Sequence, residues 1–358
     1  MSRRPPAAIA LCLLAGSSAG FAADSPGRVT VAPNADRVCQ VARRPDYLNV
    51  DFIVSNGTGR DVALSEIRAS VLGRGGNVIE RRVVWQQALA LVGLGPNAAV
   101  AAGHRGLIFN PLHFNAVRPG LRLRYEFDFS GQAPVAVTLV ARSCVTRARL
   151  ILPLIGRVGV LDGHDMLSHH RRLDYLASWA QADGLIDNPE RYALDLVLVD
   201  SAGRRFRGNG LRNEDYYGWG QAVRAPGAGI VVAMHDGQPD NDRIGSENLW
   251  HGRSWESANG NYVLIDHGGG EFSLVAHLRQ GSVRARVGQR VRPGETIGQV
   301  GNSGSSLMPH VHYQLQGGAG NDARGLPAYF HGLTVLGTGE GNGRDGVAVD
   351  SGDMLVAH

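Results

Sequence analysis

The sequence contains no lysine, so all 36 of its basic residues are arginine. This absence excludes chemistry that requires a lysine side chain. Acidic and basic residues nearly balance, with a formal net charge of +4. No run of basic residues is long enough to indicate binding to nucleic acid. We therefore expect no nucleic-acid partner.

Long hydrophobic runs are also scarce. One run extends from Ala7 to Ala15, after Arg3 and Arg4, and is followed by small residues up to Ala22. This pattern is typical of a secretory signal peptide, which we predict for residues 1–22. No later run approaches the roughly 20 apolar residues that span a membrane. The sequence thus predicts an exported, soluble protein, periplasmic or extracellular, without a transmembrane segment.

Cysteine is rare, with three residues in the chain, of which Cys12 lies in the predicted signal peptide. Cys39 and Cys144 lie near the two ends of the first segment of the mature protein. Exported proteins meet an oxidising compartment, so we expect these two residues to form a disulfide. Two buried thiols are the alternative.

The length of 358 residues and the 43% hydrophobic content suggest two domains. Short alternating runs separated by Gly, Asn and Pro turns predict a β-sandwich over residues 28–153, which we interpret as a spacer or docking module. Residues 154–190 are polar and rich in histidine, and we expect a linker there. Strand patterns return over residues 191–335 and predict a second all-β domain. Residues 336–358 form a Gly-rich tail whose end, "DMLVAH", could form a strand.

A histidine pair in "PHVHYQL" suggests a metal site. His310 and His312 are two residues apart in a strand pattern, so their side chains share one face and can converge. His277 lies near the end of the strand pattern "FSLVAHL", where alternation places it on the face of Val275. Asp195 lies in the apolar run "YALDLVLV", where burial of an unpaired carboxylate would be costly.

Residues 191–316 resemble the lysostaphin-like, or LytM-type, zinc endopeptidases, which cut peptidoglycan cross-links. The resemblance rests on "YALD", "APGAGIVV", "NGNYVLIDHGGGEFSLVAHLRQGSV", "VGQRVRPGETIGQVGNSGSS" and "PHVHYQL", in the order and spacing of the family. It implies an antiparallel β-sheet peptidase domain, a Zn²⁺ cofactor and peptidoglycan peptides as partners. It also implies that Asp195 and His312 bind zinc and that His277 and His310 are the catalytic histidines.

These roles agree with the chemistry of zinc. Three protein ligands leave one position for water and lower the pKa of that water toward 7. We expect His310 to act as the general base and His277 to stabilise the oxyanion, although the two roles could be exchanged.

One position departs from the family pattern. Its H-x-x-x-D motif requires a histidine four residues before Asp195, where this chain has Arg191. Arginine stays protonated and cannot coordinate zinc. Either His170 or His169 supplies the missing ligand, or the site is degenerate and the domain binds the cell wall or activates another wall hydrolase. We favour the first interpretation and choose His170 as the ligand.

Overall fold

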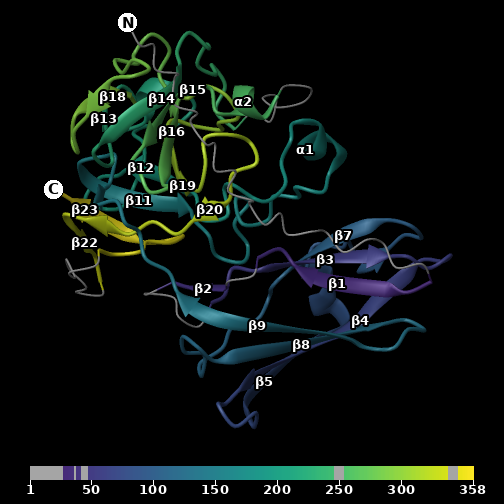
Figure 1. The fold of residues 1–358 in the computed structure, drawn as a ribbon. Helices are drawn as coiled ribbons and strands as arrows, with labels where there is room; N and C mark the ends of the chain where they lie inside the picture. The colour runs from purple at the N-terminus through teal and green to yellow at the C-terminus, as the bar shows by residue number, and fades with distance from the viewer. Residues whose placement is uncertain (1–26, 36–37, 42–46, 246–253, 338–345) are drawn as a thin grey trace, which may run out of the picture.

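The computed structural model describes residues 27–35, 38–41, 47–245, 254–337 and 346–358 (Figure 1). The predicted signal peptide lies outside the described residues. Within them the helices are short: α1 (Ser178–Ala182), α2 (Trp255–Ala258) and the 3-10 helices η1 (Gln86–Leu91) and η2 (Asn213–Asp215). Strands form the rest of the regular structure, so the predicted all-β class is confirmed. None of the described helices has the length and apolar character needed to cross a membrane.

The N-terminal region consists of two sheets around one core. A three-stranded sheet has the order β1-β3-β7, and a second sheet has the order β2-β9-β8-β4-β5, with β6 paired to β4. These strands are β1 (Val29–Pro33), β2 (Val38–Gln40), β3 (Asp51–Asn56), β4 (Val62–Leu72), β5 (Val78–Trp85), β6 (Ala99–Val100), β7 (Arg105–Phe109), β8 (Arg122–Phe129) and β9 (Val135–Ser143). Alternation explains the packing in β8, where Leu123, Tyr125 and Phe127 are buried between more exposed neighbours.

The predicted disulfide is present and joins Cys39 to Cys144, with 5.4 Å between the two Cα atoms. Cys39 lies in β2, which pairs in parallel with the end of β9, next to Cys144. The bond therefore holds the first strand of this sheet to the point where the chain leaves the sandwich.

The C-terminal region is built on a ten-stranded sheet. Its order is β17-β14-β15-β16-β19-β12-β11-β23-β22, with β20 paired to β19. Two small pairs, β10 with β21 and β13 with β18, complete the region. The strands are β10 (Leu150–Ile151), β11 (Gly156–Asp162), β12 (Leu194–Leu198), β13 (Ala222–Arg224), β14 (Gly229–His235), β15 (Asn261–Asp266), β16 (Phe272–Leu278), β17 (Arg290–Val291), β18 (Thr296–Gln299), β19 (Val311–Gln316), β20 (Gly325–Leu326), β21 (Phe330–His331), β22 (Leu333–Val335) and β23 (Met354–Ala357).

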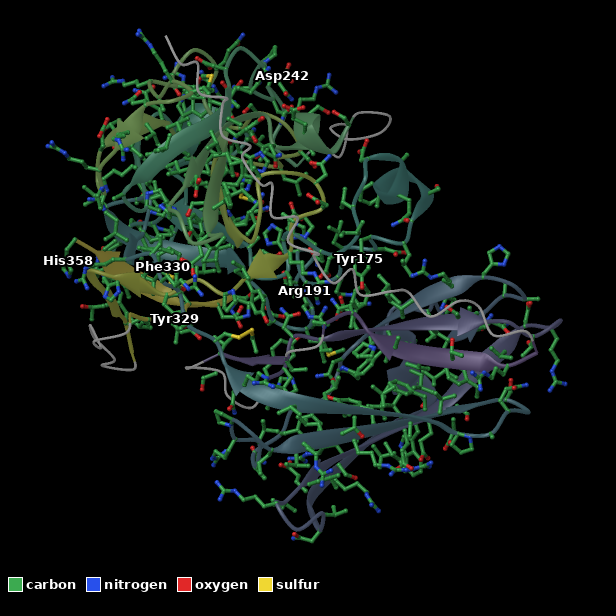
Figure 2. The ribbon with its side chains drawn as sticks, viewed as in Figure 1. Tyr175, Arg191, Asp242, Tyr329, Phe330 and His358 are labelled. Atoms are coloured by element: carbon green, nitrogen blue, oxygen red, sulfur yellow. A yellow bond between two sulfur atoms is a disulfide. The ribbon has the colours of Figure 1, made fainter. Side chains whose placement is uncertain are left out.

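The segment expected to be a linker differs from that expectation. Residues 156–162 form β11, which lies inside the large sheet between β12 and β23. Its partner β23 is almost 200 residues away in the sequence, at the predicted "DMLVAH" strand. Residues 163–190 then run to the boundary between the two regions, where Figure 2 places Tyr175 and Arg191. The segment is thus part of the second region and of its contact with the first.

Candidate metal centre

The register of the large sheet brings Asp195 and His312 together. Asp195 on β12 is directly paired with His312 on β19, and His312 is paired on its other side with Ala276 on β16. His312 Nδ1 lies 3.3 Å from Asp195 Oδ1. The side chains of His312 and Asp195 are 4% and 13% exposed, and Tyr313 with its core neighbours occupies the opposite face of the same strands.

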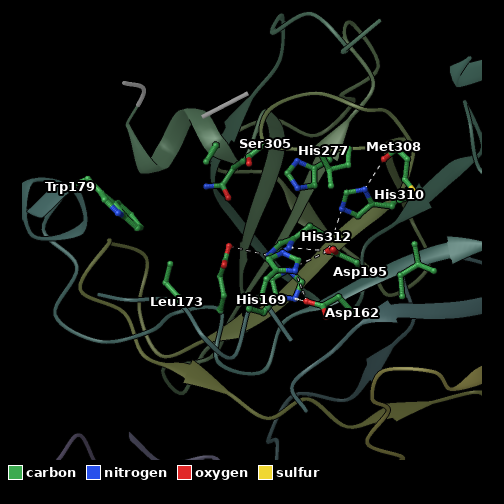
Figure 3. A pocket seen from close by; sticks show the side chains of 16 residues that line it. Asp162, His169, Leu173, Trp179, Asp195, His277, Ser305, Met308, His310 and His312 are labelled. Atoms are coloured by element: carbon green, nitrogen blue, oxygen red, sulfur yellow. Dashed lines mark hydrogen bonds and ion pairs between the residues drawn. The ribbon is translucent and has the colours of Figure 1, made fainter. Parts of the chain in front are cut away.

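His310 lies one residue before β19 and points to the same place as His312. Its Nε2 atom is 3.2 Å from Asp195 Oδ1. The predicted convergence of the two histidines is therefore what the structure shows, with the carboxylate between them (Figure 3).

His277 reaches the site by a different route from the one that strand alternation predicts. Val275 and Leu278 both point into the main core, so His277 does not share the face of Val275. Between these two residues β16 has one residue more than β15, and His277 has a φ of 61°. Such a bulge redirects a side chain. It places the His277 ring 4.8 Å from that of His310 and 5.6 Å from that of His312, measured between centroids.

The fourth histidine comes from the loop that follows β11. His170 is 1% exposed, and its Nε2 atom lies 3.4 Å from Asp195 Oδ1. His169 instead has a side chain that is 69% exposed, and its Nδ1 atom lies 2.6 Å from Asp162 Oδ2. Of the two histidines considered for the missing ligand, the structure therefore brings His170 to Asp195 and His312.

One of these imidazoles is held in the orientation of a metal ligand by a hydrogen bond. His312 Nε2 donates to Gln314 Oε1 at 3.0 Å, which fixes the tautomer and leaves the lone pair of Nδ1 for a metal. His170 Nδ1 lies 3.2 Å from Asp162 Oδ2 but makes no hydrogen bond to it. His312 Nδ1 and His170 Nε2 both face Asp195.

The donor set fits a zinc ion. One ligand atom each from His170, Asp195 and His312 lie within 4.8 Å of one another, and all three residues are buried. Two imidazoles and a carboxylate are typical ligands of catalytic zinc, which keeps a further position for water or substrate. Asp162, His169 and His170 form a second such group, but His169 in it is exposed.

Backbone carbonyls hold the other two histidines. His310 Nδ1 donates to the Met308 carbonyl at 2.7 Å, and His277 Nδ1 donates to the Ser303 carbonyl at 2.8 Å. In these tautomers Nε2 is the acceptor atom, and in His310 that atom lies beside Asp195. This is the state that can accept a proton.

The pKa values of Asp195 and His277 are both lowered, but for different reasons. Burial alone would raise the pKa of Asp195, but His310 and His170 outweigh this effect and hold that pKa well below its usual range. Burial, together with His310 and His312, holds the pKa of His277 well below its ordinary value. Asp195 is therefore ionised and His277 neutral near pH 7.

A cavity of about 650 Å³ is lined by the four histidines and the aspartate described above, namely His170, Asp195, His277, His310 and His312. Its polar wall also contains Asp162 and Glu190, and its apolar wall contains Trp179, Leu173 and Leu307. Figure 3 shows Trp179 across the pocket from Asp195 and His310. Sequence reasoning missed all five of these wall residues, although a carboxylate directly before "RYALD" was a signal for Glu190.

Arg191 has a place outside the cavity. Its guanidinium is buried, with Nη2 2.7 Å from Asp187 Oδ1 and 2.7 Å from Asp51 Oδ2. Its pKa is raised because these two carboxylates outweigh the effect of burial. The residue in the position of the expected first ligand thus forms ion pairs at the boundary with the N-terminal region.

Comparison with known families agrees with this geometry. Residues 215–323 match peptidase family M23, so the chain contains a domain of this metallopeptidase family. The matched segment includes His277, His310 and His312, whereas His170 and Asp195 precede it.

Relatives match over short segments. Peptidoglycan DD-endopeptidase ShyC of Vibrio cholerae is 39% identical over 62 residues, 17% of this chain and 14% of that protein. DD-carboxypeptidase/endopeptidase Mpg of Neisseria meningitidis is 37% identical over 88 residues, 25% of this chain and 19% of that protein. The chain thus aligns with less than a fifth of the length of either relative.

Among solved structures, the catalytic domain of lysostaphin from Staphylococcus simulans is 16% identical, with a TM-score of 0.24. The match covers 50% of this chain and 86% of that domain. A TM-score this low supports no detailed comparison of the two structures.

Proposed function

We propose that this chain is an exported zinc endopeptidase that hydrolyses the peptide cross-links of peptidoglycan. The observation that carries the proposal is the convergence of His170, Asp195 and His312 in one cavity, with His277 and His310 beside them. The names of the relatives ShyC and Mpg, peptidoglycan DD-endopeptidase and DD-carboxypeptidase/endopeptidase, support the substrate class.

His170, Asp195 and His312 would hold the zinc ion. When bound, zinc supplies Lewis acidity and lowers the pKa of a coordinated water. Gln314 keeps the ring of His312 in orientation by accepting a hydrogen bond from its Nε2 atom.

The two remaining histidines would transfer protons. One accepts the proton of the attacking water, and the other, when protonated, donates to the carbonyl oxygen on which negative charge develops. The low pKa of His277 keeps its ring neutral, so it is not the protonated donor, and its Nε2 atom carries the lone pair that can accept a proton. His310 would then be the donor, which exchanges the two roles expected from the sequence.

Export is supported by the disulfide between Cys39 and Cys144, because such bonds persist in oxidising compartments. The predicted signal peptide over residues 1–22 points the same way.

The alternative is a degenerate domain that binds the cell wall or activates another wall hydrolase. Arg191, in the position of the first ligand of the family motif, is the observation that favours it. The two functions differ in metal content and in turnover.

Purified mature protein is the material for the test. Zinc per chain is measured by mass spectrometry, and purified peptidoglycan is digested and its fragments separated by chromatography. We expect one zinc per chain and loss of cross-linked fragments, with His312→Ala as the inactive control. Zinc-free protein that binds peptidoglycan without changing its fragments would establish the degenerate domain instead.

A further inference from the structure

His170 differs from the other two proposed zinc ligands, Asp195 and His312, because no strand carries it. It lies in the loop that follows β11, and a loop by itself holds a side chain less firmly than a strand in the middle of a sheet. Its carbonyl accepts a hydrogen bond from Asn188 Nδ2 at 2.7 Å. The next residue along the chain, Arg171, supplies the largest fully buried side chain among the described residues.

Arg171 reaches out of the C-terminal region into the sandwich. Its guanidinium is paired with the Asp51 carboxylate through Nη1, and its Nη2 donates to the Val50 carbonyl at 2.8 Å. Asp51 begins β3, and both side chains are completely buried. The Arg171 guanidinium also lies 5.4 Å from the centre of the Phe109 ring, on β7.

Because the ion pair of Arg171 and Asp51 is buried, its two side chains are held in one arrangement. A buried charge without a partner is costly, so Arg171 cannot leave Asp51 without a large loss of stability. Asp51 is also paired with Arg191, which in turn is paired with Asp187. An arginine that contacts a carboxylate with one Nη atom and a carbonyl with the other is fixed in orientation as well as in distance.

The loop has apolar support on the same side. Tyr175, Ala180 and Leu185 pack with Ile53 and Phe109 of the sandwich in one buried cluster. The sandwich thus contacts the loop segment both through the buried ion pair and through this cluster. Consecutive Cα atoms are 3.8 Å apart, so a fixed Arg171 leaves little freedom to the backbone of His170.

We propose that Asp51 is a positioning residue of the metal centre: by holding Arg171 it fixes His170 as the third zinc ligand. The N-terminal sandwich then completes the site, in contrast to the spacer or docking module expected from the sequence. The inference rests on the proposed function, because it requires His170 to bind zinc.

Zinc affinity measured by competition with a chromophoric chelator tests the inference without reference to activity. We compare the wild type, His170→Ala, Asp51→Asn and Arg172→Gln, all as mature chains. Arg172 is the matched control, because its guanidinium also reaches the sandwich, donating to the Leu91 carbonyl at 2.6 Å, but is paired with no carboxylate of the described residues. Circular dichroism of the metal-free proteins verifies that each variant is folded.

We expect Asp51→Asn to weaken zinc binding by about 10- to 100-fold, the usual effect of losing an outer residue that orients a ligand. Arg172→Gln should remain within about twofold of the wild type. With Co²⁺ in place of zinc, Asp51→Asn should also change the visible absorption spectrum, because the ligand set becomes incomplete.

If Asp51→Asn does not fold, Arg171→Lys replaces it. Lysine keeps the positive charge but lacks the planar fork that contacts both Asp51 and Val50. The same loss of zinc affinity is expected.

Wild-type affinity in a folded Asp51→Asn or Arg171→Lys variant, with weakened binding in His170→Ala, would overturn this inference and leave the proposed function intact. Wild-type affinity in His170→Ala would overturn both the ligand set and the inference, because there would be no ligand to position.

Discussion

Two buried aspartates of this protein have opposite chemical surroundings. Asp195 is surrounded by the imidazoles of three histidines, whereas Asp51 lies between the guanidinium groups of Arg171 and Arg191. In both cases burial would raise the pKa of the carboxyl, and the neighbouring side chains outweigh this effect and lower the pKa.

The difference lies in what the neighbours can do besides carrying charge. A neutral imidazole has a lone pair for a metal or a proton, but a guanidinium has only N–H donors and stays protonated. The Asp195 cluster can therefore exchange its protons for a metal ion. The Asp51 cluster can only hold two parts of the chain together.

The largest effect should come from removing the first aspartate. Asp195→Ala should reduce zinc from one per chain to none, because His170 and His312 alone are one ligand short of a catalytic site. Mass spectrometry of the purified protein measures this. His169→Ala is the matched control and should retain zinc, since its exposed ring is paired with Asp162. A full zinc complement in Asp195→Ala would refute the ligand assignment.

Removal of the second aspartate should act on stability. Asp51→Asn should lower the free energy of unfolding by about 3–5 kcal/mol, because it leaves the buried guanidinium of Arg171 without a carboxylate and that of Arg191 with one carboxylate in place of two. Urea denaturation of the metal-free protein measures the change. Glu214→Gln, which breaks an exposed pair with Arg212, should leave the urea midpoint unchanged. Equal effects of the two substitutions would show that the buried ion pair contributes no more to the free energy of unfolding than the exposed pair.

The histidines around Asp195 should separate metal binding from catalysis. His310→Ala and His277→Ala should each retain zinc and lose about a hundredfold in peptidoglycan hydrolysis, the usual loss for a general base or an oxyanion donor. Metal analysis and digestion of peptidoglycan are run on the same samples. Loss of zinc in both variants would make these residues ligands instead.

Acid should produce the smallest effect. The pKa of Asp51 is lower in the folded chain than its usual value of 3.8. Its ionised form therefore stabilises the fold above that value, and this contribution is lost as the pH falls below it. We expect the difference in unfolding free energy between the wild type and Asp51→Asn to shrink below about pH 4. Parallel curves from pH 7 to 3 would contradict this.

Local patterns in the sequence predict most of the sheet part of the site. The spacing of His310 and His312 predicts a shared face, and the apolar run around Asp195 predicts a buried carboxylate in need of partners. Both features depend on residues adjacent in the chain. The register that pairs Asp195 with His312 follows from them only once the sheet is assembled.

What the sequence did not predict depends on distant partners. The strand β11 was missed because its neighbour β23 comes from the end of the chain. The buried position of Arg171 was missed because its counter-charge, Asp51, lies 120 residues earlier. The bulge at His277 was missed because alternation has no signal for one extra residue in a strand.

The positive φ of His277 also limits which residue types can replace histidine at this position. Among the described residues other than glycine, only Ala98 shares this backbone conformation. Valine, isoleucine and threonine are strained in it, whereas asparagine, aspartate and glycine accept it readily. In a saturation library at position 277, variants should therefore be lost first because their residue cannot adopt this backbone conformation. The folded variants should then differ in whether their side chain can replace histidine in catalysis. The folded but inactive members of the library should be enriched in asparagine and glycine.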